Sequence, residues 1–410
     1  MSKILPVPNG WKPAKIKDAA HVNPRSNTVD DDSLVTFLPM NAVSESGLIQ
    51  GAEIRKAIDV KKGFTSFETG DVLVAKITPC FENYKGCLCT DLKNDRGYGS
   101  TEFHVLRPKK NITGEYLHIL TRTHHFRGTG ELNMTGTAGQ KRVPTVFLNN
   151  YDFPLPQLSE QKTIANLLST WDEAIEKTER LIHAKERSLN AYGRDLFDRR
   201  NDGNYDGWKV VKLKSVLTEH GDKSTGLEEV YSVSVHKGLI NQVEHLGRSF
   251  SAANTDNYNR VHFGDIVYTK SPTGDFPLGI VKQSYTENDV IVSPLYGVFT
   301  PKTFNLGIVL DFYFSSSMRA RNYLFPIVQK GAKNTIAITN KTFLSNTLHL
   351  PVDEQAQKEV AEFVFAAREE IGLLKQLAEQ YKTQKRGLMQ KMLTGEWRVK
   401  PEIINQYMEA

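Results

Sequence analysis

The 410-residue chain is poor in cysteine and has no long hydrophobic run. Its three cysteines, Cys80, Cys87 and Cys89, lie close together, and their odd number argues against a disulfide framework. A Cys-x6-Cys-x-Cys spacing is not usual for zinc, so we expect ordinary small side chains there. No apolar run approaches the roughly 18 residues of a membrane helix. The first residues have prolines where a signal-peptide core would stand, so we expect a cytoplasmic protein with no membrane partner.

The motifs of common enzyme classes are also missing. There is no G-x-x-x-x-G-K-[S/T] phosphate loop, Gly97-x-Gly99 lacks the third glycine of a dinucleotide loop, and the tetrad of amino-methyltransferases is absent. Glu160-Gln161-Lys162 contains the E-x-K part of a nuclease motif, but so short a match is common by chance. The adjacent His124 and His125 would point apart on a helix, whereas a metal pair prefers i, i+4 spacing. We therefore predict no catalytic residue and no metal site.

The composition is that of an ordinary soluble protein with a mildly basic charge. The chain has 52 Lys and Arg against 47 Asp and Glu, a net charge of +5, and 39% hydrophobic residues. This charge permits a polyanionic partner without requiring one. Because single cores stop growing at roughly 250–300 residues, the length predicts two or three domains.

Two long helices with matching hydrophobic seams are the strongest pattern. Apolar residues alternate at steps of four and three, as in a helix that buries one seam against a partner helix. The first seam spans about 33 residues, which corresponds to roughly 50 Å of helix. The second seam repeats the first with an offset of 196 residues, as Val360 follows Ile164, Val364 follows Leu168 and Ile371 follows Ile175, so the two helices match in length and register. The residues that we expect in these seams are Ile164, Leu168, Trp171, Ile175, Ile182 and Leu189, and then Val360, Val364, Ile371, Leu374, Tyr381 and Leu388.

The remainder of the chain repeats as well. Gly207-Trp208-Lys209 restates Gly10-Trp11-Lys12, and Gly264-Asp265 restates Gly70-Asp71 ahead of a strand-like run. The order block, helix, block, helix predicts an α+β protein with two globular domains of mixed structure and a pseudo-twofold internal repeat, joined by an antiparallel coiled coil. We place the four parts at residues 1–152, 153–200, 201–350 and 351–400. Ser159 is the predicted N-cap of the first long helix, and Glu115–His125 is predicted as a helix in the first block.

Basic, amide and aromatic side chains cluster in loops after each Gly-Asp strand. Arg and Lys suit phosphates and guanine edges, and Gln and Asn suit adenine edges. We take these residues as candidates for DNA contact because the cluster recurs at equivalent places in both blocks. They are Lys76, Thr78, Tyr84, Lys85, Arg96, Tyr98, Gln140, Lys141 and Arg142 in the first block, and Lys270, Ser271, Thr273, Lys282, Gln329, Lys330, Lys333 and Asn334 in the second.

The chain resembles the specificity (S) subunits of type I restriction–modification enzymes. Phe153–Ile175 (FPLPQLSEQKTIANLLSTWDEAI) and Lys385–Val399 (KRGLMQKMLTGEWRV) resemble the two conserved helical regions of that family, and Gly136–Val143 (GTAGQKRV) resembles the end of a recognition domain. The second helix entry, LPVDEQAQKEV, departs from the pattern because it has one proline and its Glu354-Gln355 stands earlier relative to the seam.

The resemblance implies a non-catalytic subunit that reads double-stranded DNA. Each recognition domain would read one half of a split target, and the coiled coil would set the gap, with ~50 Å of helix equal to about 15 base pairs at roughly 3.4 Å each. The helices would dock two methyltransferase (M) subunits, and restriction (R) subunits would join them. The chain itself would bind no cofactor, whereas S-adenosylmethionine, ATP and magnesium would bind to the partners. The alternative from another class is a coiled-coil adaptor that does not bind DNA, and a third possibility is an enzyme in its own right.

Overall fold

The computed structural model describes residues 6–25, 29–137, 139–199, 207–243, 255–330 and 336–404. The chain divides into two compact units, each made of segments from distant parts of the sequence. Unit 1 comprises Met1–Thr178 with Leu377–Ala410, and unit 2 comprises Glu179–Gln376. Among the described residues, none of the helices combines the length and the apolar character needed to cross a bilayer.

Unit 1 is built around two four-stranded sheets. The first has the order β2–β9–β6–β7 and the second the order β4–β3–β8–β5, and β1 pairs with β10 beside them. The strands are β1 (Lys12–Lys15), β2 (Ala20–Val22), β3 (Leu34–Leu38), β4 (Glu53–Lys56), β5 (Thr65–Glu68), β6 (Val72–Ala75), β7 (Gly86–Leu88), β8 (Arg96–Gly99), β9 (Phe103–Pro108) and β10 (Asp152–Leu155). The helices are α1 (Ile16–Ala19), α2 (Ala57–Val60), α3 (Gly114–Thr121), α4 (His124–Leu132) and α5 (Thr145–Asn150).

Unit 2 has one four-stranded sheet, with the order β12–β19–β16–β17, and several two-stranded ribbons. The strands are β11 (Trp208–Lys212), β12 (Leu217–Glu219), β13 (Tyr231–Ser234), β14 (Gly238–Asn241), β15 (Asn259–Val261), β16 (Ile266–Thr269), β17 (Ile280–Gln283), β18 (Val290–Val292), β19 (Gly297–Pro301), β20 (Gln329–Lys330), β21 (Ile336–Ala337) and β22 (Thr347–Pro351). The helices are α8 (Phe304–Phe314), α9 (Ser317–Leu324) and α10 (Asn340–Ser345).

The predicted internal repeat is confirmed by the sheet topology. The order β2–β9–β6–β7 of unit 1 matches β12–β19–β16–β17 of unit 2, and the pair β1–β10 matches β11–β22. The repeated Gly-Asp step has the same role in both units. Asp71 accepts a hydrogen bond from the Glu68 amide at 2.7 Å, and Asp265 accepts one from the His262 amide at 2.8 Å. Each buried aspartate therefore fixes the turn before the central strand of its sheet.

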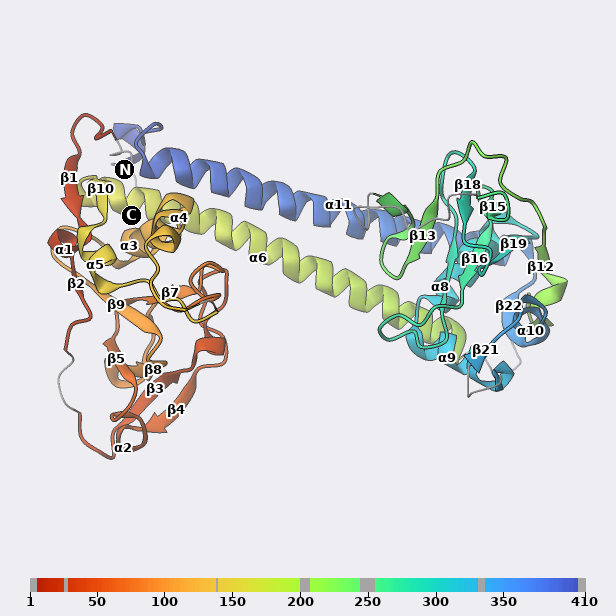
Figure 1. The fold of residues 1–410 in the computed structure, drawn as a ribbon, viewed down its shortest axis with the longest axis horizontal. Coiled ribbons are helices and arrows are strands. Elements are labelled where there is room, and N and C mark those ends of the chain that lie inside the picture. The colour runs from red at the N-terminus through yellow and green to blue at the C-terminus, as the bar shows by residue number, and fades with distance from the viewer. Residues whose placement is uncertain are drawn as a thin grey trace. The chain divides into compact units, whose positions relative to one another are not determined.

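The two long helices are α6 (Leu158–Arg194) and α11 (Glu354–Leu393), and each contributes one half to each unit. In unit 1, Trp171 packs edge-on against Tyr381 with ring centroids 5.7 Å apart, while Leu168 shares a core with Met392. The earlier residue of α6 thus lies near the later residue of α11. The two helices are therefore antiparallel in this unit, as Figure 1 shows. Gly395, just after the end of α11, has φ +71°, a backbone conformation that glycine adopts readily at helix ends.

A buried glutamine fastens the start of each long helix to its unit. Gln161 accepts a hydrogen bond from the Thr113 amide at 2.9 Å and donates to the Pro156 carbonyl at 2.9 Å. At the matching position, Gln357 donates to the Pro351 carbonyl at 3.0 Å and accepts from the Thr303 hydroxyl at 2.5 Å. Gln357 follows Gln161 by 196 residues, the same offset that separates the two seams, so the two glutamines occupy equivalent positions in the repeat.

Two local predictions are wrong. Ser159 lies inside α6, because the helix begins one residue earlier, at Leu158. The helix expected over Glu115–His125 is two helices, since the Thr123 hydroxyl accepts the Phe126 amide and caps a new helix. In unit 2, Asp311–Tyr323 is likewise divided between α8 and α9, with Ser316 as the second cap.

Candidate nucleic-acid interface

Several predicted DNA-contact residues of unit 1 meet in a small three-segment ribbon. The backbone of Thr78 donates to the Lys141 carbonyl at 3.0 Å, and the Val143 amide donates to the Lys76 carbonyl at 2.8 Å. Arg142 also forms isolated bridges with Ile77 and Thr135. The structure thus brings together five of the predicted residues from sequence positions about 60 apart. We call the set Lys76, Thr78, Gln140, Lys141 and Arg142 the basic ribbon.

The guanidinium of Arg142 is oriented by a carboxylate. Its Nε and one terminal nitrogen donate to the two oxygens of Glu102 at 3.0 and 2.9 Å, and its other terminal nitrogen donates to the Gln140 carbonyl at 3.1 Å. Hydrogen bonding to Arg142 lowers the pKa of Glu102, and the same contact raises the pKa of Arg142. The Arg142 side chain remains 42% exposed. Gln140 and Lys141 are exposed beside it, so the ribbon offers donors to a polyanion.

Two arginines that the sequence analysis missed, the half-buried Arg122 and the buried Arg127, hold the turn that carries Tyr84 and Lys85. Arg122 donates to the Tyr84 carbonyl at 3.1 Å, and Arg127 donates to the Phe81 carbonyl at 2.9 Å. Burial lowers the pKa of Arg127 to about 9. Lys85 itself donates to the Met40 carbonyl at 3.3 Å. Arginines that donate to carbonyl oxygens in this way support the local fold. Nε of Arg127 donates to the carbonyl of Thr121, six residues earlier, and in unit 2 Nε of Arg319 donates to the carbonyl of Tyr313, also six residues earlier.

Two candidates of unit 1 point into the protein. Tyr98 in β8 is 5% exposed and packs with Val35 and Phe37, so its ring is not available to a base in this structure. Arg96 pairs with Glu68 and keeps only 12% of its side chain exposed. The alternation of a strand explains both positions, because residues two apart share one face of the sheet.

The candidates of unit 2 divide in the same way. Lys270 is half-buried after β16, and burial lowers its pKa, while Ser271 and Thr273 are exposed in the turn that follows. Lys282 is 13% exposed and lies 3.8 Å from Asp311, so it faces a buried carboxylate. Asp311 also pairs with Arg368 of α11, which makes this an internal ion pair network.

The remaining candidates of unit 2 lie near residues 329–337. Gln329 and Lys330 form β20, which pairs with β21 in an antiparallel ribbon. Lys333 and Asn334 lie outside the described residues.

The seam residues of the long helices line the faces that pack together. Ile164, Leu168, Ile182, Val360, Val364 and Ile371 are each less than 9% exposed, and Trp171, Ile175, Leu189, Leu374, Tyr381 and Leu388 are half-buried. Two lysines beside the seam residues form ion pairs within their own units, Lys385 with Asp172 and Lys185 with Glu370, the latter at 2.8 Å. Their charged ends therefore stay at the edge of the seam.

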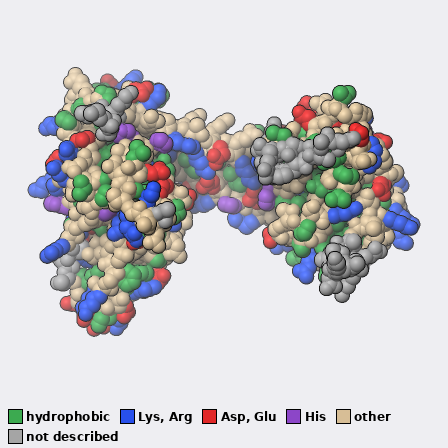
Figure 2. All heavy atoms as spheres, in the orientation of Figure 1, with side chains coloured by type: hydrophobic (Ala, Val, Ile, Leu, Met, Phe, Trp, Pro, Cys, Tyr) green, Lys and Arg blue, Asp and Glu red, His purple; other side chains and the backbone are tan. Residues whose placement is uncertain are grey.

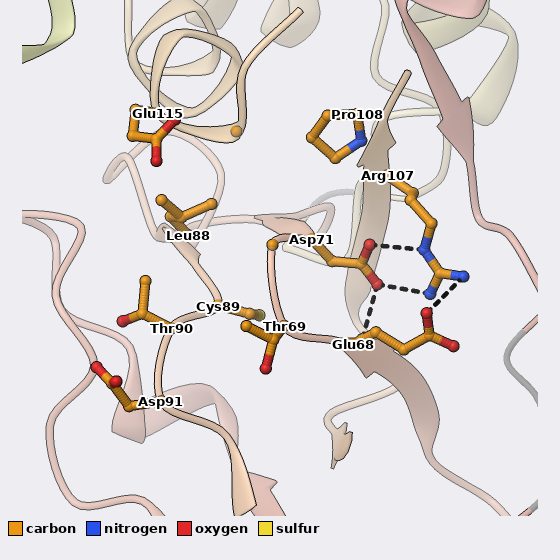
Figure 3. Close-up of a pocket in the computed structure, with 12 residues that line it drawn as sticks. Glu68, Thr69, Asp71, Leu88, Cys89, Thr90, Asp91, Arg107, Pro108 and Glu115 are labelled. Atoms are coloured by element: carbon orange, nitrogen blue, oxygen red, sulfur yellow. Dashed lines mark hydrogen bonds and ion pairs between the residues drawn. The ribbon is translucent and has the colours of Figure 1, made fainter. Parts of the chain in front are cut away.

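A pocket in unit 1 has an unsuitable charge for a phosphate. It measures about 580 Å³ and is bordered by Glu68, Asp71, Asp91 and Glu115. Figure 3 shows Arg107 turned toward Asp71, to which it donates at 2.8 and 2.9 Å. Hydrogen bonding to Asp71 raises the pKa of Arg107, so this cation is already paired.

Figure 2 shows Lys and Arg side chains spread among Asp and Glu on the visible face of each unit. The visible faces therefore carry mixed charge rather than one extended basic patch.

Comparison with known proteins places the first part of the chain. Residues 8–185 match the family model of the type I restriction modification DNA specificity domain. Over 207 residues the chain is 38% identical to the type I restriction enzyme EcoAI specificity subunit of Escherichia coli, and over 194 residues it is 38% identical to the EcoEI specificity subunit. These matches cover 48% and 46% of this chain, and about a third of each relative, 35% and 32%.

Solved structures share the fold along nearly the whole chain. An S subunit from M. genitalium has a TM-score of 0.56 and 13% identity, with 96% of this chain and 99% of that chain covered. A chain from a study of complex assembly and conformational transition in a type I R-M system has a TM-score of 0.57 and 16% identity, with 96% and 100% covered. One sheet order occurs in both units, and the two long helices are antiparallel. Residues 8–185, which match the specificity domain, contain the first copy of that sheet. The first part of the chain is therefore similar to the specificity subunits of type I restriction enzymes, and residues 8–185 match the DNA specificity domain of such systems.

Proposed function

We propose that this chain is the DNA-reading subunit of a type I restriction–modification complex. Each recognition domain reads one half of a bipartite double-stranded target, and α6 with α11 sets the distance between the half-sites. The duplication is the observation that carries this proposal. The two units share one sheet topology, while the loops and ribbons around those sheets differ. A conserved scaffold with two different loop sets suits a protein that reads two different short sequences.

The basic ribbon supports the proposal in unit 1. Exposed Lys141 supplies a mobile cation for phosphate, and Arg142 presents a planar guanidinium that Glu102 orients. Gln140 adds an exposed amide beside them. This mixture provides both charge for the backbone and hydrogen-bonding groups for base edges.

The partners and cofactors follow from the same proposal. The exposed faces of α6 and α11 dock two methyltransferase subunits, and restriction subunits join that core. S-adenosylmethionine, ATP and magnesium act on those partners, and this chain contributes recognition without catalysis.

A domain exchange tests the proposal directly. The chain would be produced with its methyltransferase partner, and the methylated motif would be read by sequencing the DNA of cells that carry the pair. Replacement of residues 1–150 by the matching block of another family member should change one half of the motif and leave the other half intact. A change in both halves would contradict the two-reader proposal. The absence of any sequence-specific gel shift by the assembled complex would support the adaptor alternative.

A further inference from the structure

A cluster of two histidines and three aspartates lies in unit 2 beside the central sheet. His220 follows β12, His262 follows β15, and Asp265 precedes β16. Asp222 and Asp289 approach the same imidazoles from two other loops. We call these five residues the histidine–aspartate cluster. The sequence analysis missed it because its members are scattered over about 70 residues.

The two imidazoles converge on one carboxylate oxygen. Oδ2 of Asp222 lies 3.0 Å from Nε2 of His262 and 3.7 Å from Nδ1 of His220. The ring centroids of the two histidines are 5.3 Å apart. Each outer nitrogen faces another aspartate, with His220 Nε2 at 2.9 Å from Asp265 and His262 Nδ1 at 3.0 Å from Asp289.

The cluster has more acceptors than protons to share among them. A neutral imidazole has one N–H, so if His220 donates to Asp265, its Nδ1 presents a lone pair toward Asp222. Nδ1 of His220 is fully enclosed and lacks a hydrogen-bond partner among the described residues. Both nitrogens of His262 face carboxylates: a neutral ring can donate to only one of them, whereas the charged ring that these carboxylates favour donates to both.

The neighbouring positive charge does not cover this excess. Arg260 pairs with the other oxygen of Asp289 at 2.6 Å and lies 3.3 Å from Glu228, so its guanidinium is already matched by two carboxylates. The Thr300 hydroxyl donates to the far oxygen of Asp265 at 2.8 Å. A cation between Asp222 and the two imidazoles would be bound by the lone pairs of Asp222 Oδ2, His220 Nδ1 and His262 Nε2, which otherwise face one another.

We propose that the cluster binds a divalent transition metal of the zinc type, with His220 Nδ1, His262 Nε2 and Asp222 Oδ2 as ligands. Zinc takes nitrogen ligands at about 2.0–2.1 Å and carboxylate oxygen at about 2.0–2.2 Å, which places neighbouring ligands of a tetrahedron roughly 3.3 Å apart. The observed separations of 3.0 and 3.7 Å bracket that value. Water supplies the fourth ligand, because the Asp222 side chain is 58% exposed.

The outer aspartates match the second shell of a metal site. Metal-bound histidines commonly donate their other N–H to a carboxylate, which fixes the ring orientation. Asp265 serves His220 in this way, and Asp289 serves His262. The metal would tie the end of β12 to the turn between β15 and β16, and so would stabilise unit 2. This role goes beyond the proposed reading of DNA.

Metal binding to the full chain tests the proposal. The protein would be stripped with EDTA, dialysed into metal-free buffer at pH 7.5 and titrated with zinc chloride by calorimetry. We expect one equivalent to bind, and we expect a rise in the unfolding temperature that EDTA reverses. Asp222→Asn and His262→Gln should each weaken zinc binding at least tenfold. The control His236→Gln removes an exposed histidine outside the cluster and should leave binding unchanged.

Cobalt provides an independent readout of the ligand set. Cobalt(II) in the stripped wild-type chain should give the visible absorption of a tetrahedral site, and Asp222→Asn should lose it. Because Asp222 is exposed, this variant is expected to keep its fold, which circular dichroism checks. Wild-type protein that takes up no more zinc than the His220→Gln/His262→Gln double variant would overturn the proposal and leave the cluster as an ion pair network only. This outcome is separate from a failure of DNA recognition, which the domain exchange measures.

Discussion

Arg398 donates two hydrogen bonds to Glu160, from Nε at 2.6 Å and from a terminal nitrogen at 2.8 Å, across 238 residues of sequence. The Trp11 indole N–H donates to the same carboxylate at 2.9 Å, and the guanidinium lies 5.2 Å from the Trp11 ring centroid. The Glu160 side chain is only 5% exposed. One buried carboxylate therefore joins the N-terminal segment, the start of α6 and the segment after α11 within unit 1.

The substitution Glu160→Gln should destabilise unit 1. It removes the negative charge while both donors remain, and hydrogen bonds to charged groups contribute about 1.5–3 kcal/mol. Because Arg398 is 39% exposed and water can solvate it, we expect a loss of about 2 kcal/mol rather than the larger cost of a fully buried pair. Urea unfolding followed by tryptophan fluorescence measures this loss.

The matched control for Glu160 is Glu173→Gln on the same helix. Glu173 pairs with Lys177 at 3.1 Å in an exposed i, i+4 contact. Such pairs contribute about 0.3–0.5 kcal/mol. Equal effects of the two substitutions would show that the Arg398 contact does not stabilise the fold.

The glutamine at the start of each long helix should contribute as much to the free energy of unfolding as the seam residues beside it. Gln161→Leu leaves the Thr113 amide and the carbonyls of Asn111 and Pro156 without a partner in a buried place. An unsatisfied buried polar group costs about 1–3 kcal/mol, so we expect a total loss of about 3 kcal/mol in the free energy of unfolding. The control Gln355→Leu removes an exposed amide near the start of α11 and should change that free energy by less than about 0.5 kcal/mol.

Much of the architecture could be predicted because it depends on periodic patterns. The seams from Ile164 and from Val360 specify two long helices through residue spacing alone, and the Gly-Asp steps at Asp71 and Asp265 mark equivalent turns. Such a pattern can be recognised in the sequence because it depends only on the spacing between residues that are near one another in the chain.

The contact residues could not be assigned in the same way. Tyr98 has the chemistry of a base-stacking residue, but its strand turns it into the core, and Lys282 faces the buried Asp311. Whether a polar side chain points outward depends on strand register and tertiary packing, which residue type does not encode. The cluster around His220 and His262 was missed for the related reason that its members come from loops distant in sequence.

Acid should destabilise unit 1 through His118. Burial, with Arg122 as a further cause, lowers the pKa of His118 to about 3, whereas an unfolded histidine titrates near 6.5. Below pH 6.5 the unfolded chain therefore binds a proton that the folded chain does not, and stability falls as the pH falls toward 3. Between pH 7 and pH 5 this one group should cost about 2 kcal/mol.

The variant His118→Gln isolates that contribution. It cannot titrate, so its free energy of unfolding should fall by about 2 kcal/mol less than that of the wild type between pH 7 and pH 5. His21→Gln removes an exposed histidine in β2 and provides the comparison. Urea unfolding at each pH gives both values. Parallel pH profiles for wild type and His118→Gln would contradict the assignment, even if the variant is less stable at every pH.

The basic ribbon should contribute to DNA binding mainly through charge at Lys141. Lys141→Ala removes an exposed cation whose backbone carbonyl, not its side chain, supports the ribbon, so the fold should persist. If this lysine contacts one phosphate, the slope of log Kd against log salt should decrease in magnitude by about 0.9. Affinity for specific and for non-specific DNA should fall by similar factors, because a phosphate carries no sequence information. Filter binding of the assembled complex over a series of salt concentrations measures both quantities.

Arg142→Lys distinguishes base reading from charge at the neighbouring position. The substitution keeps the positive charge but loses the planar guanidinium that Glu102 orients at 2.9 and 3.0 Å. If Arg142 reads a base edge, specific affinity should fall by about 1–3 kcal/mol while non-specific affinity and the salt slope stay nearly constant. The control Lys62→Ala removes an exposed lysine remote in sequence from the ribbon and should change neither. A uniform loss for all DNA sequences in Arg142→Lys would assign this side chain to the phosphate backbone, and base recognition in unit 1 would then have to come from other loops.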